Sequence, residues 1–143
     1  MFDYRNFGIM GGASFPKLAF GKFDINFSEH FGMDLQASLG VYWSIKEADL
    51  LYYFSRDDWS TYLGVGYQNW DFYGFSSSTS YNGIVFGDGN SATALSVPLG
   101  FLYTALSGFA YEIGFAVDVF LNAPADLRGK IVPEGQISIG YFF

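Results

Sequence analysis

The sequence predicts an all-β protein, an eight-stranded antiparallel up-and-down transmembrane β-barrel that forms a single domain over residues 1–143. Three observations lead to this prediction. Apolar residues alternate with polar or small ones at a period of two along most of the chain. Aromatic residues make up 22% of the sequence, and charged residues only 15%, against roughly 25% in ordinary soluble domains. The last residues, 135–143, form an alternating strand that ends on Phe143.

Eight segments carry the alternation, and most are close to the roughly 9 to 11 residues that a tilted strand needs to cross a bilayer. The first four are residues 5–14, 18–28, 32–43 and 48–55. The other four are residues 59–72, 92–104, 109–121 and 132–143. The pattern is clearest over 22–27, which reads Lys-Phe-Asp-Ile-Asn-Phe, and over 109–119. An even number of strands is expected of a single-chain bacterial barrel.

The connections between these segments alternate in length. Tight turns are expected near 29–30, 56–58 and 106–108. At the opposite end we expect connections near 16–17, 45–47, 73–91 and 122–131, of which the last two are long. Short periplasmic turns and longer outer loops are typical of outer-membrane barrels. Both termini then lie at the short-turn end, and we expect them in the periplasm.

Residue size indicates which face of each strand meets lipid. Eight strands enclose a narrow interior, too small for the bulky apolar face that almost every segment carries. The other face combines charges with Gly, Ala and Ser, which suits a polar lumen. Aromatic residues gather near strand ends, as expected of rings at the two membrane boundaries. At the short-turn end these are Phe27, Phe31, Phe54, Trp59, Tyr103, Phe109 and Tyr141, and at the other end Trp43 and Tyr67.

The C-terminal strand carries the most specific motif. Its apolar face ends on Phe143, and the pattern resembles the signal that the outer-membrane assembly machinery reads, through Gly135, Ile137, Ile139, Tyr141 and Phe143. The whole chain resembles the small eight-stranded outer-membrane proteins of the OmpA/OmpX type. This resemblance implies a monomer in the bacterial outer membrane, in contact with the lipid bilayer and lipopolysaccharide. It selects no activity, because barrels of this type include anchors, adhesins, channels and lipid-modifying enzymes.

Composition excludes several classes of function. A net charge of −7 without a basic patch argues against nucleic acid as a partner. The absence of cysteine excludes disulfides and thiolate metal sites. No apolar run reaches the 18 residues expected of a membrane helix. Met1 leads directly into charged residues rather than a secretory signal, so we expect the sequence to be the mature part of an exported protein.

Polar residues on the inner face form the first candidate site. The predicted lumen network consists of Lys22, Asp24, Asp34, Gln36, Glu112, Asp118 and Glu134. One interpretation is a buried polar network that plugs the barrel. The alternative is a narrow cation-selective channel, or a carrier of a small lipophile, through an acidic lumen.

Catalysis and metal binding find little support. The single histidine, His30, falls in a predicted tight turn, and the His-x-Ser pair of lipid A deacylases is missing. The adjacent Asp57 and Asp58 lack the spacing of a calcium loop. We therefore expect no catalytic residue, no metal and no cofactor.

The long connection over 73–91 is the second candidate site. It is rich in Ser, Gly and aromatic residues, which favour adaptable binding loops. The simpler interpretation is an outward loop, or a hairpin extension that turns at 82–83 or 87–90. For recognition of an extracellular ligand we favour Phe75, Tyr81, Ile84 and Phe86. The predicted function is thus a non-catalytic membrane anchor whose outer loops form a recognition or adhesion surface.

Overall fold

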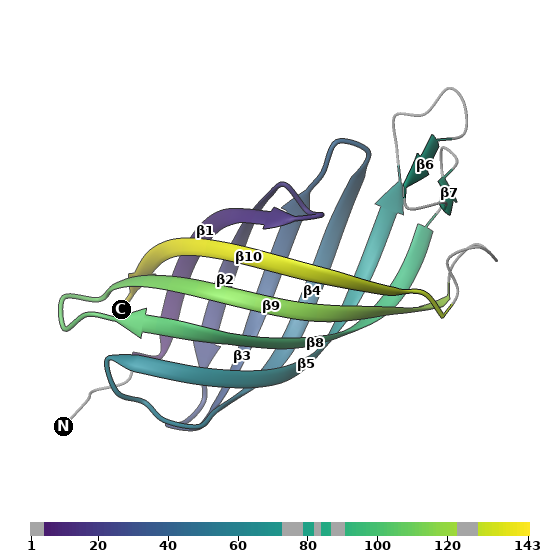
Figure 1. Ribbon diagram of the computed structural model, residues 1–143. Coiled ribbons are helices and arrows are strands. Elements are labelled where there is room, and N and C mark those ends of the chain that lie inside the picture. Colours follow the sequence, from purple (N-terminus) through teal and green to yellow (C-terminus); the bar gives the residue numbers. More distant parts are fainter. Residues whose placement is uncertain (1–4, 73–78, 82–83, 87–90, 123–128) are drawn as a thin grey trace.

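A computed structural model of the protein describes residues 5–72, 79–81, 84–86, 91–122 and 129–143 (Figure 1). The regular secondary structure of these residues consists of strands alone. They are β1 (Phe7–Phe15), β2 (Ala19–Asn26), β3 (Phe31–Leu39), β4 (Trp43–Tyr53), β5 (Trp59–Phe72), β6 (Thr79–Tyr81), β7 (Ile84–Phe86), β8 (Ser91–Thr104), β9 (Phe109–Asn122) and β10 (Ile131–Phe142). None of the described segments is a helix of the length and hydrophobicity that a membrane crossing requires.

Eight of these strands close into a barrel, in the order β1-β10-β9-β8-β5-β4-β3-β2. Every neighbouring pair is antiparallel, and β1 completes the ring by pairing with β10 from Gly8–Phe142 to Phe15–Gly135. The short β6 and β7 form a separate two-stranded sheet between β5 and β8, beyond one end of the barrel (Figure 1). The predicted eight-stranded antiparallel barrel is confirmed. Its closure leaves none of the eight strands as a free sheet edge.

One pair of strand boundaries was predicted wrongly. The sequence suggested strands over 32–43 and 48–55 with a turn near 45–47, whereas β3 ends at Leu39 and β4 begins at Trp43. The turn therefore lies at 40–42, where Val41 and Tyr42 are exposed. The polar pair Lys46-Glu47 suggested a turn, but it lies inside β4, with one side chain on each face of the wall.

The wall has an apolar outer face and a charged inner face. On β5 and β8, outward residues such as Val65, Val97 and Phe101 are about half exposed, at 53%, 47% and 47%. Inward residues on the same strands, such as Gln68 and Ser96, are 0% exposed. Alternate residues of a strand point to opposite faces, so the period-two pattern of the sequence maps directly onto the two faces of the barrel.

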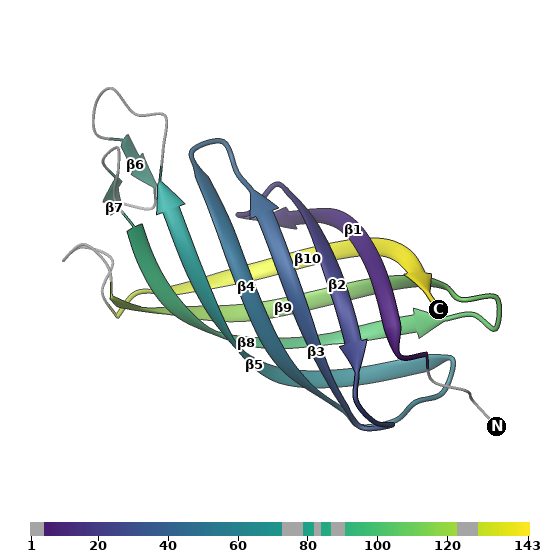
Figure 2. The ribbon, with the colours of Figure 1, turned by 180° about the vertical axis from the view of Figure 1, so that it is seen from behind.

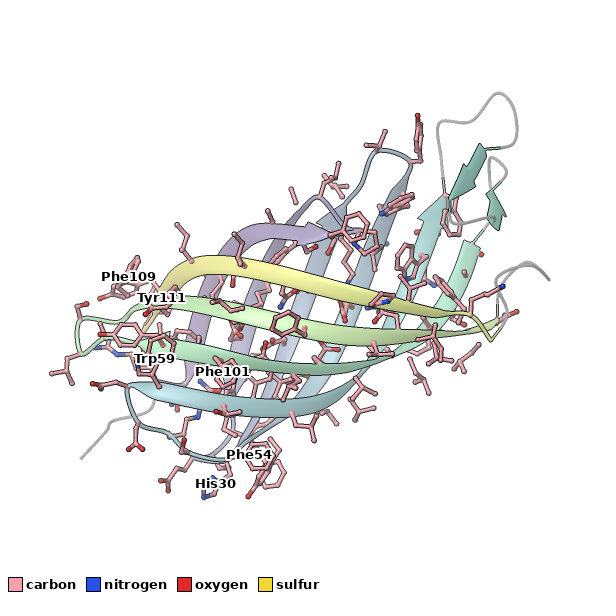
Figure 3. The ribbon with its side chains drawn as sticks, in the orientation of Figure 1. His30, Phe54, Trp59, Phe101, Phe109 and Tyr111 are labelled. Carbon is pink, nitrogen blue, oxygen red and sulfur yellow. The ribbon has the colours of Figure 1, made fainter. Side chains whose placement is uncertain are left out.

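Aromatic rings surround the barrel at the end where the turns are short (Figure 3). Trp59, Tyr103 and Tyr111 form one outward cluster, with ring centroids 4.8 to 5.3 Å apart. Phe31, Tyr52 and Phe54 form a second cluster, in which the Tyr52 ring centroid lies 5.3 Å from that of each phenylalanine. The sequence also predicts Trp43 in an outer belt at the opposite end, and this prediction is wrong. Trp43 is instead only 8% exposed and lies inside the barrel, because it begins the inward-facing row of β4.

The interior consists of three layers, which the inward residues of β4 illustrate. Ile45 belongs to an apolar cluster at the long-loop end, together with Trp43, Trp70, Phe72, Ala92, Ala94 and Phe120. Leu51 belongs to a second cluster at the short-turn end, together with Met10, Tyr53, Tyr62, Leu102, Ala110 and Phe142. Glu47 and Asp49 lie between them on the same strand. A charged layer is therefore enclosed between two apolar ones.

Candidate functional site

The charged layer is organised around two buried lysines. Lys22 comes from β2, and its Nζ lies 2.5 Å from Glu112 Oε2, 3.1 Å from Asp34 Oδ2 and 3.3 Å from Asp24 Oδ1. Three carboxylates thus surround one ammonium group whose side chain is 0% exposed. Removing a charged group from water is costly, and a buried charge is tolerated only where opposite charges and hydrogen bonds compensate the lost solvation.

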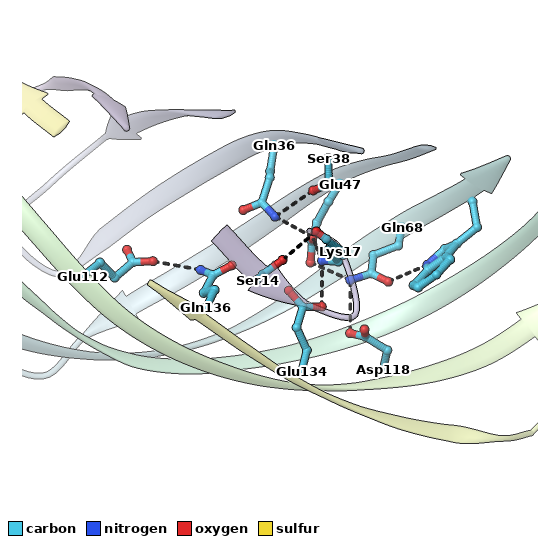
Figure 4. Close-up of polar contacts among 11 residues, drawn as sticks. Ser14, Lys17, Gln36, Ser38, Glu47, Gln68, Glu112, Asp118, Glu134 and Gln136 are labelled. Atoms are coloured by element: carbon cyan, nitrogen blue, oxygen red, sulfur yellow. Dashed lines mark hydrogen bonds and ion pairs between the residues drawn. The ribbon is translucent and has the colours of Figure 1, made fainter. Parts of the chain in front are cut away.

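Lys17 is the centre of the second cluster (Figure 4). It comes from the connection between β1 and β2, and its side chain turns into the barrel, where it is also 0% exposed. Its Nζ lies 2.5 Å from Glu47 Oε2 and 2.7 Å from Glu134 Oε2. Because Glu47 is on β4 and Glu134 on β10, this ammonium group links opposite parts of the wall.

Glutamine side chains extend both clusters. Gln68 Nε2 donates to Glu47 Oε1 at 2.8 Å and to Asp118 Oδ1 at 3.1 Å, while its Oε1 accepts from the Trp70 indole at 2.8 Å. Gln136 Nε2 donates to Glu112 Oε1 at 2.8 Å (Figure 4). These contacts join β5 to β4 and β9, and β10 to β9, on the inner side of the wall. The middle of the barrel is therefore filled by side chains that hold one another in place.

Arginine side chains occupy the short-turn end. The Arg56 guanidinium stacks on the Tyr53 ring, 3.4 Å from its centroid, and donates to Asn26 Oδ1 and to the Glu29 carbonyl. Burial lowers the pKa of this guanidinium from its ordinary value. Arg5 donates to the carbonyls of Phe142 and Leu106, at 3.1 and 2.6 Å. These contacts close the end of the barrel at which β1 begins and β10 ends.

Acidic groups outnumber basic ones in this interior. Among the described residues, seven carboxylates and three basic groups are buried. The acids are Asp24, Asp34, Glu47, Asp49, Glu112, Asp118 and Glu134, and the bases are Lys17, Lys22 and Arg56. One carboxylate oxygen each of Asp24, Asp34 and Asp49 is buried and accepts no hydrogen bond within the described part of the chain. Within these residues, the buried carboxylates therefore outnumber the buried cations that could pair with them.

The structure brings together all seven residues predicted for the lumen network. Lys22, Asp24, Asp34, Gln36, Glu112, Asp118 and Glu134 are each at most 6% exposed. Sequence reasoning missed Lys17 and Glu47, which it assigned to connections, and also Asp49, Arg56 and Gln68. Glu47 and Asp49 lie in the inward row that includes Ile45 and Leu51, but that row mixes acidic and apolar residues, so polarity did not reveal it in the sequence.

The structure describes only part of the other predicted sites. Phe75 lies outside the described residues, as do the side chains of Tyr81, Ile84 and Phe86, whose backbone forms β6 and β7. His30 is in the connection between β2 and β3, where its Nδ1 lies 3.0 Å from the Tyr53 carbonyl. No group of three or more potential metal ligands occurs within the described ranges.

The C-terminal strand lies between β1 and β9. Its residues Ile137, Ile139, Tyr141 and Phe143 point outward, with exposed fractions between 44% and 63%. The Phe143 amide donates to the Phe7 carbonyl at 2.8 Å. The predicted assembly motif therefore presents one apolar row to the surroundings of the barrel.

Comparison with known proteins identifies the architecture. The structure is similar to the N-terminal β-barrel domain of Pseudomonas aeruginosa OprF, with a TM-score of 0.69 and 13% sequence identity over 97% of this chain and 98% of that one. Ail, the attachment invasion locus protein of Yersinia pestis, matches with a TM-score of 0.43 and 14% identity, over 96% of this chain and 93% of that one. No family model and no curated protein sequence matches the chain. The closed eight-stranded barrel thus has the OmpA/OmpX-type architecture that the sequence suggested.

Proposed function

We propose that the protein is a non-catalytic β-barrel of the bacterial outer membrane that anchors its loop end at the cell surface. The observation that carries this proposal is the inverted polarity of the wall. Lys17, Lys22 and Asp118 are 0 to 4% exposed, whereas large apolar residues line the outside. Water-soluble proteins place charges outside and bulky apolar residues inside, and lipid as the surrounding solvent reverses that preference.

The dimensions of the wall agree with this location. The strands β4, β5, β8 and β9 have 11 to 14 residues, enough for a tilted crossing of the bilayer. Closure satisfies the backbone hydrogen bonds of the barrel strands without water. The start of β1 and the end of β10 lie at the short-turn end (Figure 2), which we place in the periplasm.

An anchor role follows from the filled interior. Two apolar clusters enclose the lysine-centred network, so little space remains along the barrel axis. The loop end, with the β6–β7 hairpin beyond the wall, is then the part that can meet other molecules (Figure 1). We assign recognition of an extracellular ligand to this end. Deletion of residues 74–90 should abolish adhesion to the ligand-bearing surface and leave folding intact, whereas unchanged adhesion would contradict this assignment.

Refolding in detergent tests the membrane location. The unfolded protein should gain β-structure only when detergent or lipid is added, and it should migrate differently on gels before and after boiling. Circular dichroism and cold gel electrophoresis measure both properties. Folding to a soluble monomer in plain buffer would refute the proposal.

A narrow cation-selective channel is the second candidate, and the excess of buried carboxylates favours it. Recording from single molecules in planar bilayers separates the two functions. Current steps that prefer cations and shrink in an Asp118→Asn variant would support a channel and refute the sealed anchor. A silent bilayer that contains correctly folded protein would refute the channel.

A further inference from the structure

The outer face of β1–β4 carries a groove that the functions above do not use. These strands lie side by side along one flank of the barrel (Figure 2). The groove has a volume of about 570 Å³. Its floor is formed by Gly21 and Ala37, and the side chains of Ile9, Phe23 and Leu35 border it. The space above Gly21 is open, because a Cβ atom added there would meet nothing closer than a backbone oxygen at 4.0 Å.

Lys46 is the cation that points outward at one end of this groove, whereas the side chains of Lys22 and Glu47, which also line it, are buried in the lumen. Lys46 is on β4, directly opposite Ala37 of β3, and its side chain is exposed on the outer face. Lys46 makes no ion pair and no side-chain hydrogen bond with any residue that the structure describes, in contrast to the two buried lysines. On the side away from the groove, the outward residues Asn69, directly opposite Lys46, and Asp71, two residues further along β5, are polar. No carboxylate of the described residues lies within 4.0 Å of the Lys46 ammonium group, so an anionic partner from the surroundings can reach it.

Cross-strand pairing gives the direction of the groove. Lys46 pairs with Ala37, Ala37 with Gly21, and Gly21 with Gly11. The same row continues through Ile139, Tyr111, Tyr103 and Trp59 into the aromatic belt at the short-turn end. The row therefore descends obliquely across the apolar wall from Lys46, and its first three positions after the lysine carry small side chains. Gly11 borders a second groove, of about 480 Å³, between β1, β10 and β9.

The height of Lys46 matches the outer membrane boundary. Eight residues separate it along the chain from Phe54, which is 56% exposed next to the short-turn aromatic belt. With a rise of about 3.3 Å per residue and a strand tilt of about 40°, this corresponds to about 20 Å along the barrel axis. The apolar band of such barrels is about 25 Å tall. The Lys46 side chain can therefore extend to the level of the lipid headgroups.

We propose that this flank binds one lipid of the outer leaflet, with an anionic phosphate headgroup on Lys46 and an acyl chain along the groove over Ala37 and Gly21. The site rests on the proposed membrane location. Charge complementarity selects the occupant: the groove offers apolar walls for a chain and one free cation for a phosphate. The contact would orient the barrel relative to the outer leaflet and mark this flank as its lipid-binding side.

Native mass spectrometry of the refolded protein tests the proposal. Micelles contain equal amounts of phosphatidylglycerol, which is anionic, and phosphatidylcholine, which is zwitterionic, and the ratio of the two lipids retained is measured. The wild type should prefer phosphatidylglycerol. Lys46→Gln should lower that preference about fivefold, the order of magnitude of one lysine near an anionic surface. Lys46→Arg should preserve it, and so should Lys130→Gln, which removes an exposed cation elsewhere.

Filling the groove provides a second, charge-independent test. Gly21→Leu should reduce retention of both lipids, whereas Val97→Phe adds comparable bulk to the outer face of β8 and should not. Equal lipid ratios for Lys46→Gln and Lys130→Gln would overturn the proposal, and so would a second copy of the chain bound in place of lipid. Each variant is first checked for heat-modifiable migration. Failure of the wild type in that check would refute the membrane location itself, which separates the two failures.

Discussion

Replacing Lys17 by methionine is predicted to destabilise the barrel by about 3 to 5 kcal/mol. Lys17 Nζ lies 2.5 Å from Glu47 and 2.7 Å from Glu134, and neither carboxylate side chain is more than 4% exposed. Methionine is similar in length and apolar, so the substitution removes the charge while it preserves most of the volume. Two buried carboxylates then lose their shared counter-charge.

The expected magnitude follows from the geometry. At an effective dielectric constant of about 20, unit charges at about 2.6 Å attract each other by about 6 kcal/mol. Desolvation of each buried ion costs several kcal/mol, so the net contribution of the pair is much smaller than this gross attraction. The loss of one partner is more costly than the pair is stabilising, because the remaining charges stay buried. Losses of about 3 to 5 kcal/mol are typical of such broken pairs.

Urea unfolding of the protein in lipid vesicles measures this loss as a change in the free energy of unfolding. Lys130→Met is the matched control, since it removes an exposed lysine outside the lumen, and it should change stability by less than about 1 kcal/mol. Adding Glu47→Gln to Lys17→Met should restore part of the loss. Lowering the pH should also narrow the gap to wild type, because protonation neutralises the stranded carboxylates. A loss no larger than that of Lys130→Met, or strictly additive effects in the double variant, would refute the reasoning.

Three further predictions concern the apolar outer face, the close contact between β1 and β10, and the C-terminal residue. Val65→Arg, in the middle of the apolar face of β5, should cost about 2 to 4 kcal/mol in vesicle unfolding assays, whereas Ser44→Arg near the loop end should cost about 1 kcal/mol or less. Gly12→Ala should destabilise the barrel by about 1 to 3 kcal/mol in the same assay, because a Cβ there would lie 1.9 Å from a carbonyl oxygen of β10, whereas Gly21→Ala should be tolerated. Phe143→Ala should lower the amount of protein in the outer membrane of expressing cells, as measured by immunoblotting, without impairing refolding in detergent. Equal amounts of both proteins in the membrane would argue against an assembly role.

The strand framework was predictable because two different surroundings act on alternate residues. In the middle layer the lumen selects small or charged side chains and the outer face selects bulky apolar ones, so the central part of each crossing strand carries a strong period-two signal. At the two ends, where bulky residues such as Trp70 and Phe142 also point inward, the signal is weaker. The predicted strand over 59–72 coincides with β5, and that over 109–121 differs from β9 by one residue. Such long strands leave little freedom in register.

The same physics explains the error at the β3–β4 turn. Polarity normally distinguishes turns from strands, but here Val41 and Tyr42 form an exposed apolar turn, while Lys46 and Glu47 lie within a strand. An inner face that carries charge makes a strand resemble a turn, and a turn with apolar residues resembles a strand. Burial alternates unbroken from Ile45 to Tyr53 in the structure, but the polarity of the sequence does not, because the inward row passes from apolar Ile45 to acidic Glu47 and Asp49 and back to apolar Leu51.

Lys17 could not be placed by periodicity, because it belongs to no strand. A lysine in a connection is ordinarily solvated, and its burial here depends on Glu47, 30 residues away in sequence, and on Glu134 in the last strand. Charge balance was the available clue. The sequence predicted five inward carboxylates and a single inward lysine, an imbalance too costly for a narrow lumen unless further cations enter from the connections. Lys17 and Arg56 add two buried cations to Lys22, but Glu47 and Asp49 add two carboxylates to the five predicted. Among the described residues, seven buried carboxylates therefore face three buried cations, an excess of four. Protons or small cations must compensate that excess, which makes the pH and salt dependence of barrel stability a direct measure of what the lumen holds.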